Sequence, residues 1–174
     1  MFIIVALTMI GYGVMHSWLA STNAKQLIRH WMGERRYYGL YRATYNLIAI
    51  VSLAPVIGLV LFRPGTVIWQ ITGTSQFLLL IIQLVGLAGV IISLTQINLG
   101  QFIGLTQASA YFQAKQLPLP KESLQYTGLY RLVRHPLYTF SLLTIWPMST
   151  MTEAWLAFNI LVTVYFIVGS KFEE

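Results

Sequence analysis

The chain of 174 residues contains no cysteine and no aspartate, and only 9% of its residues are charged. Without cysteine there can be no disulfide framework, no thiolate metal site and no cysteine nucleophile. Soluble domains are ordinarily about a quarter charged, so this chain has too few polar residues to cover a surface that faces water. Hydrophobic residues make up 56% of the chain, which indicates an integral membrane protein.

Positive charge exceeds negative charge, and the formal net charge is +6 at pH 7. Basic patches can bind nucleic acid, but no basic segment here is long enough to form a polar domain. Loops on the cytoplasmic side of a membrane are rich in lysine and arginine, which explains the charge more simply. We expect the lipid bilayer to be the partner, with no nucleic acid and no stable protein partner.

Apolar stretches of about 20 residues are long enough to cross a ~30 Å hydrocarbon core as helices. Three stretches stand apart, at about Phe2 to Ser21, Tyr41 to Phe62 and Gln76 to Asn98. The last apolar block, from Leu137 to Ser170, is too long for one span, and the segment around Pro147 divides it into a helical hairpin. Lipid admits only helices or closed barrels, and the runs lack the two-residue alternation of barrel strands.

These stretches predict an all-α fold, an integral membrane helical bundle of about five transmembrane helices with a C-terminal helical hairpin. We expect residues 1–174 to form a single transmembrane domain. Residues 1–98 would be an N-terminal part with three spans, and residues 99–174 a cytoplasmic loop plus the hairpin. The first stretch has no basic region before it and no small-residue cleavage site, so we expect a retained span rather than a signal peptide.

Basic residues are concentrated in two of the predicted loops. The loop after the first span and the loop before the hairpin hold most of the lysines and arginines, whereas the charged residues of the other two loops are Arg63 and Glu153. The positive-inside rule therefore predicts that the N-terminus lies outside. Both basic loops and the C-terminus would be cytoplasmic. The longest loop, from about Gly100 to Val133, is rich in aromatic residues, which argues against disorder.

Two charged groups flank the predicted hairpin. Arg134 and His135 precede Pro136, and proline suits the first turn of a helix because its missing N–H costs nothing there. Glu173 and Glu174 follow the second arm. Each group alone has a plain explanation, a basic membrane anchor for the first and a solvated chain end for the second.

The spacing of the two groups predicts that they meet. Ala154 lies midway between His135 and Glu173, so each arm of the hairpin would have about 18 residues, or roughly 27 Å. That length is one membrane crossing, and both groups would return to the cytoplasmic face. Arginine can hold a carboxylate through two parallel hydrogen bonds, and glutamates suit an ammonium or a sulfonium. Together they could hold a zwitterion, with Tyr138 against a ring or an apolar surface.

The stretch from Gly128 to Tyr138, read Gly-Leu-Tyr-Arg-Leu-Val-Arg-His-Pro-Leu-Tyr, is followed by a hairpin and a pair of glutamates. It resembles the cofactor region of the isoprenylcysteine carboxyl methyltransferase superfamily. The residues from Gly128 onward, including Trp146 to Thr152 and Tyr165 to Gly169, are especially similar to membrane thiol methyltransferases of the methanethiol S-methyltransferase type. In the front half, His16 to Ser21 and Tyr41 to Asn46 resemble the related nurim and NnrU membrane proteins.

The resemblance implies an S-adenosylmethionine-dependent membrane methyltransferase that acts on a small or lipophilic acceptor, a thiol or an isoprenylcysteine-type carboxylate. Its two candidate catalytic residues are Arg134 and Glu173. Arg134, or alternatively Arg131, would orient an anionic acceptor, and Glu173 would receive a thiol proton. Methyl transfer mainly requires alignment and exclusion of water, and no metal is expected. The cofactor-binding residues that the resemblance implies are Tyr130, Arg134, His135, Pro136, Tyr138, Glu173 and Glu174.

In the superfamily the paired glutamates lead into a basic amphipathic tail that helps to close the cofactor site. The printed sequence ends at Glu174, so either this tail is absent or the sequence is part of a longer chain. Two other functions stay open. Carotene isomerases related to the NnrU group resemble the same framework, which implies haem binding through His16 and His135. A non-catalytic membrane protein like nurim would bind neither group.

Polar residues inside the predicted spans need partners, because an unpaired polar group is costly in lipid. We expect His16 to hydrogen-bond to a neighbouring helix, through Ser17 or Asn46. On the third span, Gln96 and Asn98 either join helices or line the proposed site. Gly86 and Gly89 on the same span predict close helix packing. The stretch from Ala24 to Tyr38 is expected to lie on the membrane surface as an amphipathic segment. These two glycines and the Ala24–Tyr38 segment carry no chemistry of their own.

Overall fold

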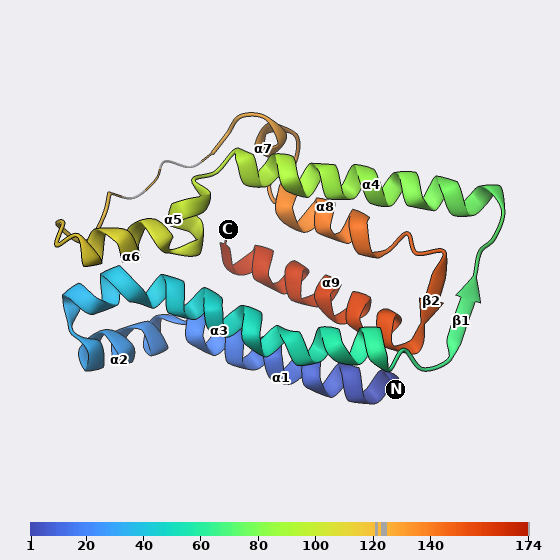
Figure 1. The fold of residues 1–174 in the computed structure, drawn as a ribbon, viewed down its shortest axis with the longest axis horizontal. Helices are drawn as coiled ribbons and strands as arrows, with labels where there is room; N and C mark the ends of the chain where they lie inside the picture. The colour runs from blue at the N-terminus through green and yellow to red at the C-terminus, as the bar shows by residue number, and fades with distance from the viewer. Residues whose placement is uncertain (121, 123–124, 174) are drawn as a thin grey trace. The chain divides into compact units, whose positions relative to one another are not determined.

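The structure is a computed structural model that describes residues 1–120, 122 and 125–173. Helices account for most of this part of the chain, and its β-structure is one two-stranded sheet (Figure 1). The predicted all-α membrane fold is confirmed.

Four helices of the described residues are long and apolar enough to cross a membrane. Helices α1 and α4 begin and end within three residues of the predicted spans. Helix α3 is longer than predicted because it starts seven residues earlier and reaches 29 residues, or roughly 43 Å. These four helices are α1 (Phe2–Ala20), α3 (Glu34–Phe62), α4 (Thr74–Thr95) and α9 (Glu153–Glu173).

The first arm of the predicted hairpin is a short helix, α8 (Pro136–Ile145). Its ten residues span roughly 15 Å, about half of a ~30 Å hydrocarbon core. Pro147 has no backbone N–H to extend the helix, and the chain turns into strand β2 (Thr150–Thr152). The prediction of two equal arms of about 18 residues is therefore wrong for the first arm. Helix α9 forms the long arm.

The sheet joins two connections that lie far apart in sequence. Strand β1 (Val67–Gln70) pairs antiparallel with β2, and Gln70 lies opposite Thr150. Figure 1 shows the two strands side by side, with β2 leading into the start of α9. The strands have four and three residues, too few for a two-residue alternation to be visible in the sequence.

The smaller helices lie in the loops that the sequence marks as basic or aromatic: α2 (Thr22–Met32), α5 (Leu99–Ile103), α6 (Leu105–Phe112) and α7 (Leu129–Leu132). The Ser21 hydroxyl accepts a hydrogen bond from the Ala24 amide at 3.2 Å and caps α2. Helix α2 ends at Met32, and its C-cap is Gly33. The φ of Gly33 is 77°, a value that glycine adopts readily and that is costly for other residues. The predicted amphipathic segment is therefore two helices, because α3 begins directly after this glycine.

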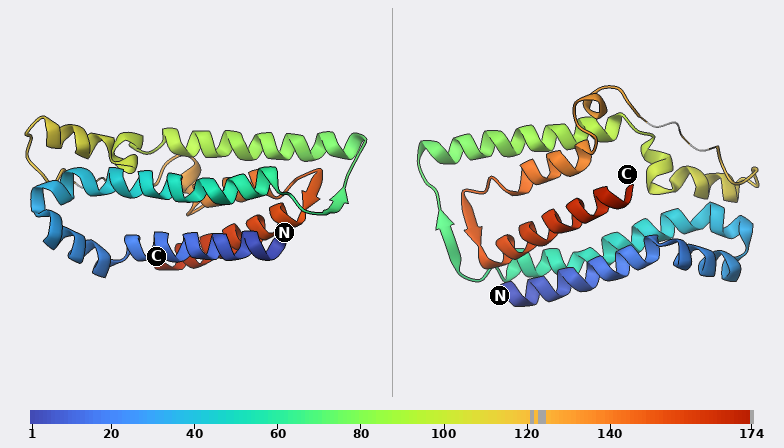
Figure 2. Two further views of the ribbon diagram at one scale, coloured as in Figure 1. Left: turned by 60° about the horizontal axis from the view of Figure 1, so that its bottom comes forward. Right: turned by 180° about the vertical axis from the view of Figure 1, so that it is seen from behind.

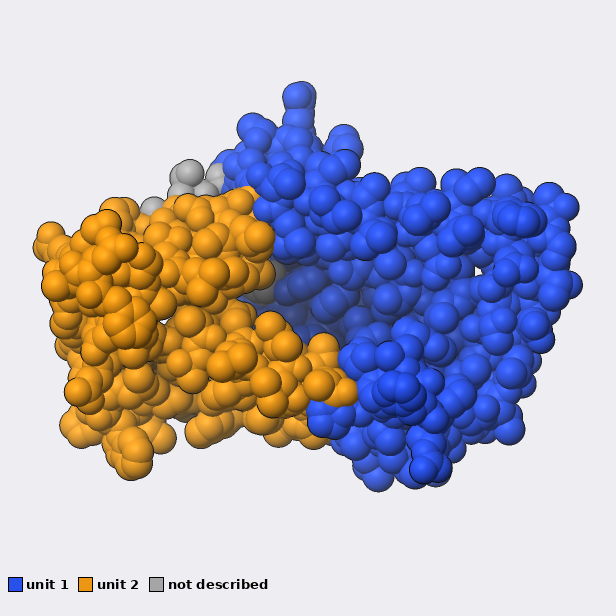
Figure 3. All heavy atoms as spheres, viewed as in Figure 1, with its two compact units in different colours: residues 1–10, 55–96, 125–174 blue, residues 11–54, 97–124 orange. Residues whose placement is uncertain are grey.

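The chain divides into two compact units, coloured separately in Figure 3. Unit 1 comprises residues 1–10, 55–96 and 125–174, and unit 2 comprises residues 11–54 and 97–124. The buried side chains of unit 1 include Met151, Ala154 and Phe158 around the start of α9. Unit 2 buries Ala24 and Ala110. The predicted boundary at residue 98 stays a prediction.

Within unit 1, α8 packs closely along α4, as Figure 1 and the right view of Figure 2 show. A Cβ atom on Gly86 would lie 2.7 Å from the backbone nitrogen of Thr144, and one on Gly89 would overlap the ring of Phe140. The Gln83 amide donates to the Thr144 carbonyl at 3.1 Å. The predicted close packing at the two glycines is confirmed.

Candidate functional site

The residues singled out from the sequence lie where α7 leads into α8, in unit 1. His135 occupies the N-cap position of α8, and Pro136 is the buried first residue of that helix. The His135 carbonyl accepts the Thr139 amide at 3.0 Å. Pro136 therefore starts the helix as predicted, with Arg134 directly before its N-cap.

Three aromatic rings form a stack at this end of α8. The ring of Tyr138 is nearly parallel to the His135 ring, with centroids 5.4 Å apart. Its other partner is the ring of Phe166 on α9, with centroids 4.5 Å apart and an interplanar angle of 13°. Tyr138 thus lies against a ring surface of the protein itself, and the stack joins the motif to the C-terminal half of α9. Phe166 belongs to the stretch from Tyr165 to Gly169 that carries the resemblance, but it was not among the predicted site residues.

Helix α9 leaves space beside this stack. Among the described residues, and leaving out the backbone of α9 itself, a Cβ atom on Gly169 would have the Tyr138 hydroxyl as its one neighbour within 4 Å, at 3.8 Å. Gly169 precedes Glu173 by four residues, about one helical turn. The last turns of α9 and the start of α8 therefore lie side by side, which is the arrangement that the sequence spacing predicts for the backbone.

The two predicted acidic residues are only partly covered by the structure. Glu173 ends α9, but its side chain and all of Glu174 lie outside the described residues. The hypothesis that the two carboxylates face Arg134 and His135 stays a prediction.

The phenol and guanidinium groups of the motif differ in exposure. Arg131 and Arg134 are exposed, whereas Tyr130 and His135 are half-buried. Burial raises the pKa of the Tyr130 phenol above its usual value of 10.0, so the hydroxyl stays neutral at physiological pH and can donate a hydrogen bond. The exposed arginines can hold an anionic group by two parallel hydrogen bonds.

A glutamine of α4 fixes the turn that leads into the motif. The Gln96 side-chain oxygen accepts the Leu129 amide at 3.0 Å. Gly128 has a φ of 60°, and a Cβ atom there would lie 2.6 Å from the amide carbon of Gln96. Gln96 therefore joins α4 to α7 rather than facing only lipid. Asn98 instead caps α5, where its side-chain oxygen accepts the Gln101 amide at 3.1 Å.

His16 lies in unit 2 and makes the predicted bond to a neighbouring helix. Its Nε2 lies 2.6 Å from the Tyr45 hydroxyl on α3, and its ring stacks on Tyr12 with centroids 5.4 Å apart. The interhelical bond is confirmed with Tyr45 as partner. The Asn46 amide, which was one expected partner, donates to the Ile103 carbonyl at 3.1 Å. Tyr37, Tyr41 and Tyr45 recur every four residues, a spacing that places rings on one helix face.

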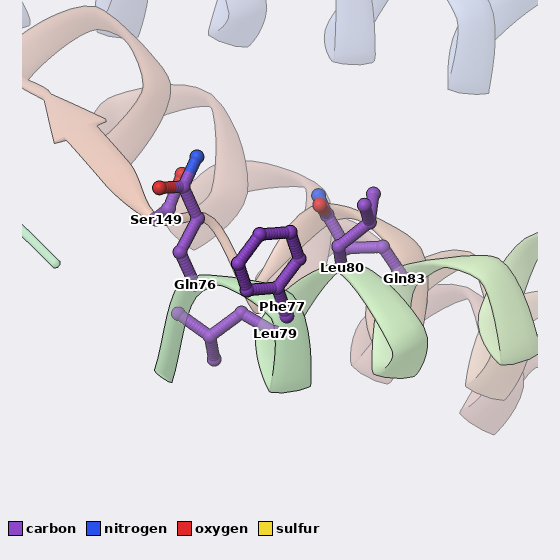
Figure 4. A pocket seen from close by; sticks show the side chains of 6 residues that line it. All are labelled: Gln76, Phe77, Leu79, Leu80, Gln83 and Ser149. Carbon is purple, nitrogen blue, oxygen red and sulfur yellow. The ribbon is translucent and has the colours of Figure 1, made fainter. Parts of the chain in front are cut away.

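A surface pocket at the opposite end of α4 is separate from this site. Two glutamines and Ser149 line it together with three apolar side chains, and Figure 4 shows them around the hollow. Gln76 in the pocket and Gln96 at the motif are 20 residues apart along the helix, or roughly 30 Å. The pocket is therefore too distant to share a ligand with Arg134 and His135.

The described residues of the site fit a zwitterionic, ring-bearing cofactor such as S-adenosylmethionine. Arg134 offers a cation for a carboxylate, the half-buried ring of His135 ends an aromatic stack, and Gly169 leaves open space beside Tyr138. Sites for cofactors are usually largely formed before the cofactor binds, and the ring stack and the start of α8 would be the preformed part here.

Proteins with similar sequences match nearly the whole chain. Methanethiol S-methyltransferase 2 of Bradyrhizobium diazoefficiens is 30% identical over 88% of this chain and 58% of its own length. A methanethiol S-methyltransferase of a Pseudomonas strain is 32% identical over 94% of this chain and 60% of its own length. The enzyme of that name from Mycobacterium tuberculosis is 30% identical, with 99% of this chain and 68% of its own length covered. No solved structure matches.

The chain thus spans about 60% of the length of the first two of these relatives. Residues 82–174 match the family model described as phospholipid methyltransferase. The match begins within α4 and takes in α7, α8, α9 and every residue of the ring stack. The chain therefore belongs to the phospholipid methyltransferase family.

Proposed function

We propose that this membrane protein is an S-adenosylmethionine-dependent methyltransferase whose acceptor is a small thiol. The observation that carries the proposal is the similarity to methanethiol S-methyltransferases, which extends over 88% to 99% of the chain in the relatives above. The family match contains the complete motif from Gly128 to Tyr138. An isoprenylcysteine-type carboxylate is the other acceptor that the sequence implies.

In this proposal, different residues of the site bind different groups of the cofactor. Arg134 holds a carboxylate through its exposed guanidinium, and Tyr130 donates a hydrogen bond from a neutral phenol. His135 presents its ring to a planar group, and Phe166 fixes Tyr138 from behind. Glu173 and Glu174 supply negative charge for an ammonium and a sulfonium, as the sequence predicts.

When bound, S-adenosylmethionine supplies a methyl carbon on a sulfonium leaving group. The chain's task is then to hold the acceptor sulfur in line with that carbon and to exclude water, which can lower the barrier by roughly 7 kcal/mol or more. Glu173 receives the proton that the thiol loses as its sulfur forms the new S–C bond. The electron pair of the broken bond stays with the departing sulfur, so charge and atoms balance without a metal or a cysteine.

The site belongs to the cytoplasmic face in this proposal. The two loops rich in lysine and arginine lie between α1 and α3 and between α4 and α8, and basic loops face the cytoplasm. The N-terminus then lies outside, and a lipophilic or small acceptor enters from the bilayer.

Isothermal titration of the detergent-purified protein with S-adenosylmethionine and S-adenosylhomocysteine tests the proposal. We expect micromolar binding, weakened at least tenfold in the His135→Ala and Glu173→Ala variants. His30→Ala is the matched control, because His30 is an exposed residue of α2 in unit 2. Absence of binding by a folded wild-type protein would refute the proposal. In that case a Soret band would indicate haem, and its absence a non-catalytic role.

A further inference from the structure

Helix α7 lacks the usual N-terminal cap. The first amides of a helix have no partner within it, and a side-chain oxygen at the N-cap ordinarily accepts one of them. The N-cap of α7 is Gly128, which has no side chain. The amide of Leu129, the first residue of α7, is nevertheless satisfied, because it donates to the Gln96 side-chain oxygen at 3.0 Å.

Gly128 and Gln96 fit each other in shape as well. Gly128 adopts a φ of 60° and a ψ of −130°, and any side chain there would collide with the Gln96 amide. Gly128 has no side chain to cap α7, and the same absence of a side chain lets the Gln96 amide approach. Gln96 is itself the C-cap of α4, where its backbone N–H bonds to the Ser93 carbonyl at 3.3 Å.

The turn held by Gln96 leads directly into the motif. Tyr130 and Arg131 lie on α7. Arg134 comes directly after the C-cap of α7, and His135 follows it as the N-cap of α8. The other end of the motif is fixed to the same helix, because Gly89 of α4 packs against α8. Helix α4 therefore holds the motif at both ends, and Gln96 is the one side chain of the described part of α4 or its caps that hydrogen-bonds to α7.

We propose that Gln96 is a positioning residue of the methyltransferase site, which sets the place of Tyr130, Arg131 and Arg134 without touching substrate or cofactor. The inference rests on the proposed function for its activity readout, but its structural part does not. Displacement of a binding group by about 1 Å can cost as much as a hundredfold in rate.

Two variants separate the hydrogen bond from the shape of the side chain. Gln96→Leu keeps the size and removes the acceptor, whereas Gln96→Glu keeps an acceptor oxygen at the same position. Gln83→Leu is the matched control, because it removes another glutamine of α4, whose bond goes to the Thr144 carbonyl of α8. All are first compared by circular dichroism and size-exclusion chromatography in detergent to show that they fold.

Hydrogen exchange gives the structural readout without any ligand. In Gln96→Leu we expect the peptide that contains Leu129 to exchange about tenfold faster, since one hydrogen bond is lost. Wild-type rates are expected in Gln96→Glu and in Gln83→Leu. Unchanged exchange in a folded Gln96→Leu protein would show that the Gln96 side chain does not hold the Leu129 amide, and would overturn the inference.

Titration with S-adenosylmethionine gives the functional readout. We expect Kd to rise at least tenfold in Gln96→Leu, to stay within threefold of wild type in Gln96→Glu, and to be unchanged in Gln83→Leu. In an activity assay KM for the cofactor should rise more than kcat falls. Faster exchange with unchanged Kd would overturn the positioning role. If the wild type itself binds no S-adenosylmethionine, the proposed function fails. The exchange result still decides whether Gln96 holds the Leu129 amide.

If Gln96→Leu does not fold, Gly128→Ala tests the same contact from the other side. The added Cβ atom displaces the Gln96 amide, so faster exchange at Leu129 and weaker binding are expected again. Wild-type exchange and Kd in folded Gly128→Ala would contradict the inference.

Discussion

Both compact units contain close glycine contacts, but these contacts join different kinds of element. In unit 1, α4 and α8 meet through glycines, so that backbone lies on backbone at Gly86 and a ring fills the space at Gly89. In unit 2, α3 holds the α5–α6 turn by side chains that reach carbonyls: Arg42 donates to Phe102 at 3.0 Å and Asn46 to Ile103 at 3.1 Å. Unit 2 also contains close glycine contacts, since a Cβ atom on Gly104 would overlap the backbone nitrogen of Ala43. The units therefore differ in what the close contact joins: two helices that carry the motif in unit 1, and a turn held on α3 with two side-chain hydrogen bonds beside it in unit 2.

This difference agrees with where the family match falls. Residues 82–174 begin just before Gly86 and include the site. Small residues let helices approach closely where apolar surface alone gives no driving force. We infer that adding a side chain at Gly86 or Gly89 in the α4–α8 contact costs more than removing any single hydrogen bond in unit 2.

The largest effect is expected for Gly86→Ala. The new methyl group would lie 2.7 Å from a backbone nitrogen that cannot move alone, so the unfolding free energy should fall by about 3 kcal/mol. Gly58→Ala on α3 is the control, because its Cβ atom would have nothing within 4 Å. It should be neutral or stabilising by up to about 1 kcal/mol. Unfolding by SDS, followed by circular dichroism, measures both. Equal effects of the two alanines would contradict the packing argument.

A smaller effect is expected for Asn46→Leu in unit 2. It leaves the Ile103 carbonyl without this donor and should lower stability by about 1–2 kcal/mol. Hydrogen exchange should quicken in the peptide that covers α5. Asn23→Leu on the exposed side of α2 should leave both quantities within error, and an equal loss there would show that the change in polarity, not the bond, matters.

Tyr45→Phe removes the hydroxyl bonded to His16 but keeps the ring that lies 4.8 Å from the imidazole. We expect a loss of about 1 kcal/mol. The exposed Tyr126→Phe change provides the reference. A loss above that of Asn46→Leu would mean that the α1–α3 contact, and not the α5–α6 turn, dominates unit 2.

The smallest effect is expected at the surface pair of Arg29 and Glu34, whose nitrogen and oxygen lie 2.7 Å apart. The hydrogen bond to this carboxylate raises the pKa of the Arg29 guanidinium, which is charged throughout the physiological range in any case. Exposed pairs contribute little and are screened by salt. Arg29→Gln should leave the unfolding curve unchanged at low and high salt, and a salt-dependent loss would show that the pair does contribute.

Hydropathy predicted the long helices well because membrane crossing depends on local composition. Predicted and observed bounds of α1 and α4 agree within three residues, and Pro136 starts α8 as expected. The same reasoning placed the backbone of α9 beside the motif. It overestimated α8, since an apolar run shows that residues are buried or in lipid but not where a helix stops.

Contacts between distant segments left no periodic trace in the sequence. The hydrogen bond between Gln96 and Leu129 joins residues 33 positions apart. Strands β1 and β2 pair with each other but are too short to show an alternating pattern. Gln96 was visible only as a polar residue near a span end, which suited either a helix contact or the site. Phe166 lies in a stretch that resembles the family, but only the structure shows that its ring stacks on Tyr138.

The most direct test of the central claim is methyl transfer itself. The purified protein in lipid nanodiscs is incubated with methanethiol and S-adenosylmethionine that carries a deuterated methyl group, and the headspace is analysed by mass spectrometry. We predict deuterium-labelled dimethyl sulfide, strongly reduced in His135→Ala and retained in His30→Ala. Folded wild-type protein that binds the cofactor but yields no labelled dimethyl sulfide would contradict the thiol as acceptor. Folded protein that neither binds the cofactor nor transfers the label would contradict the account as a whole.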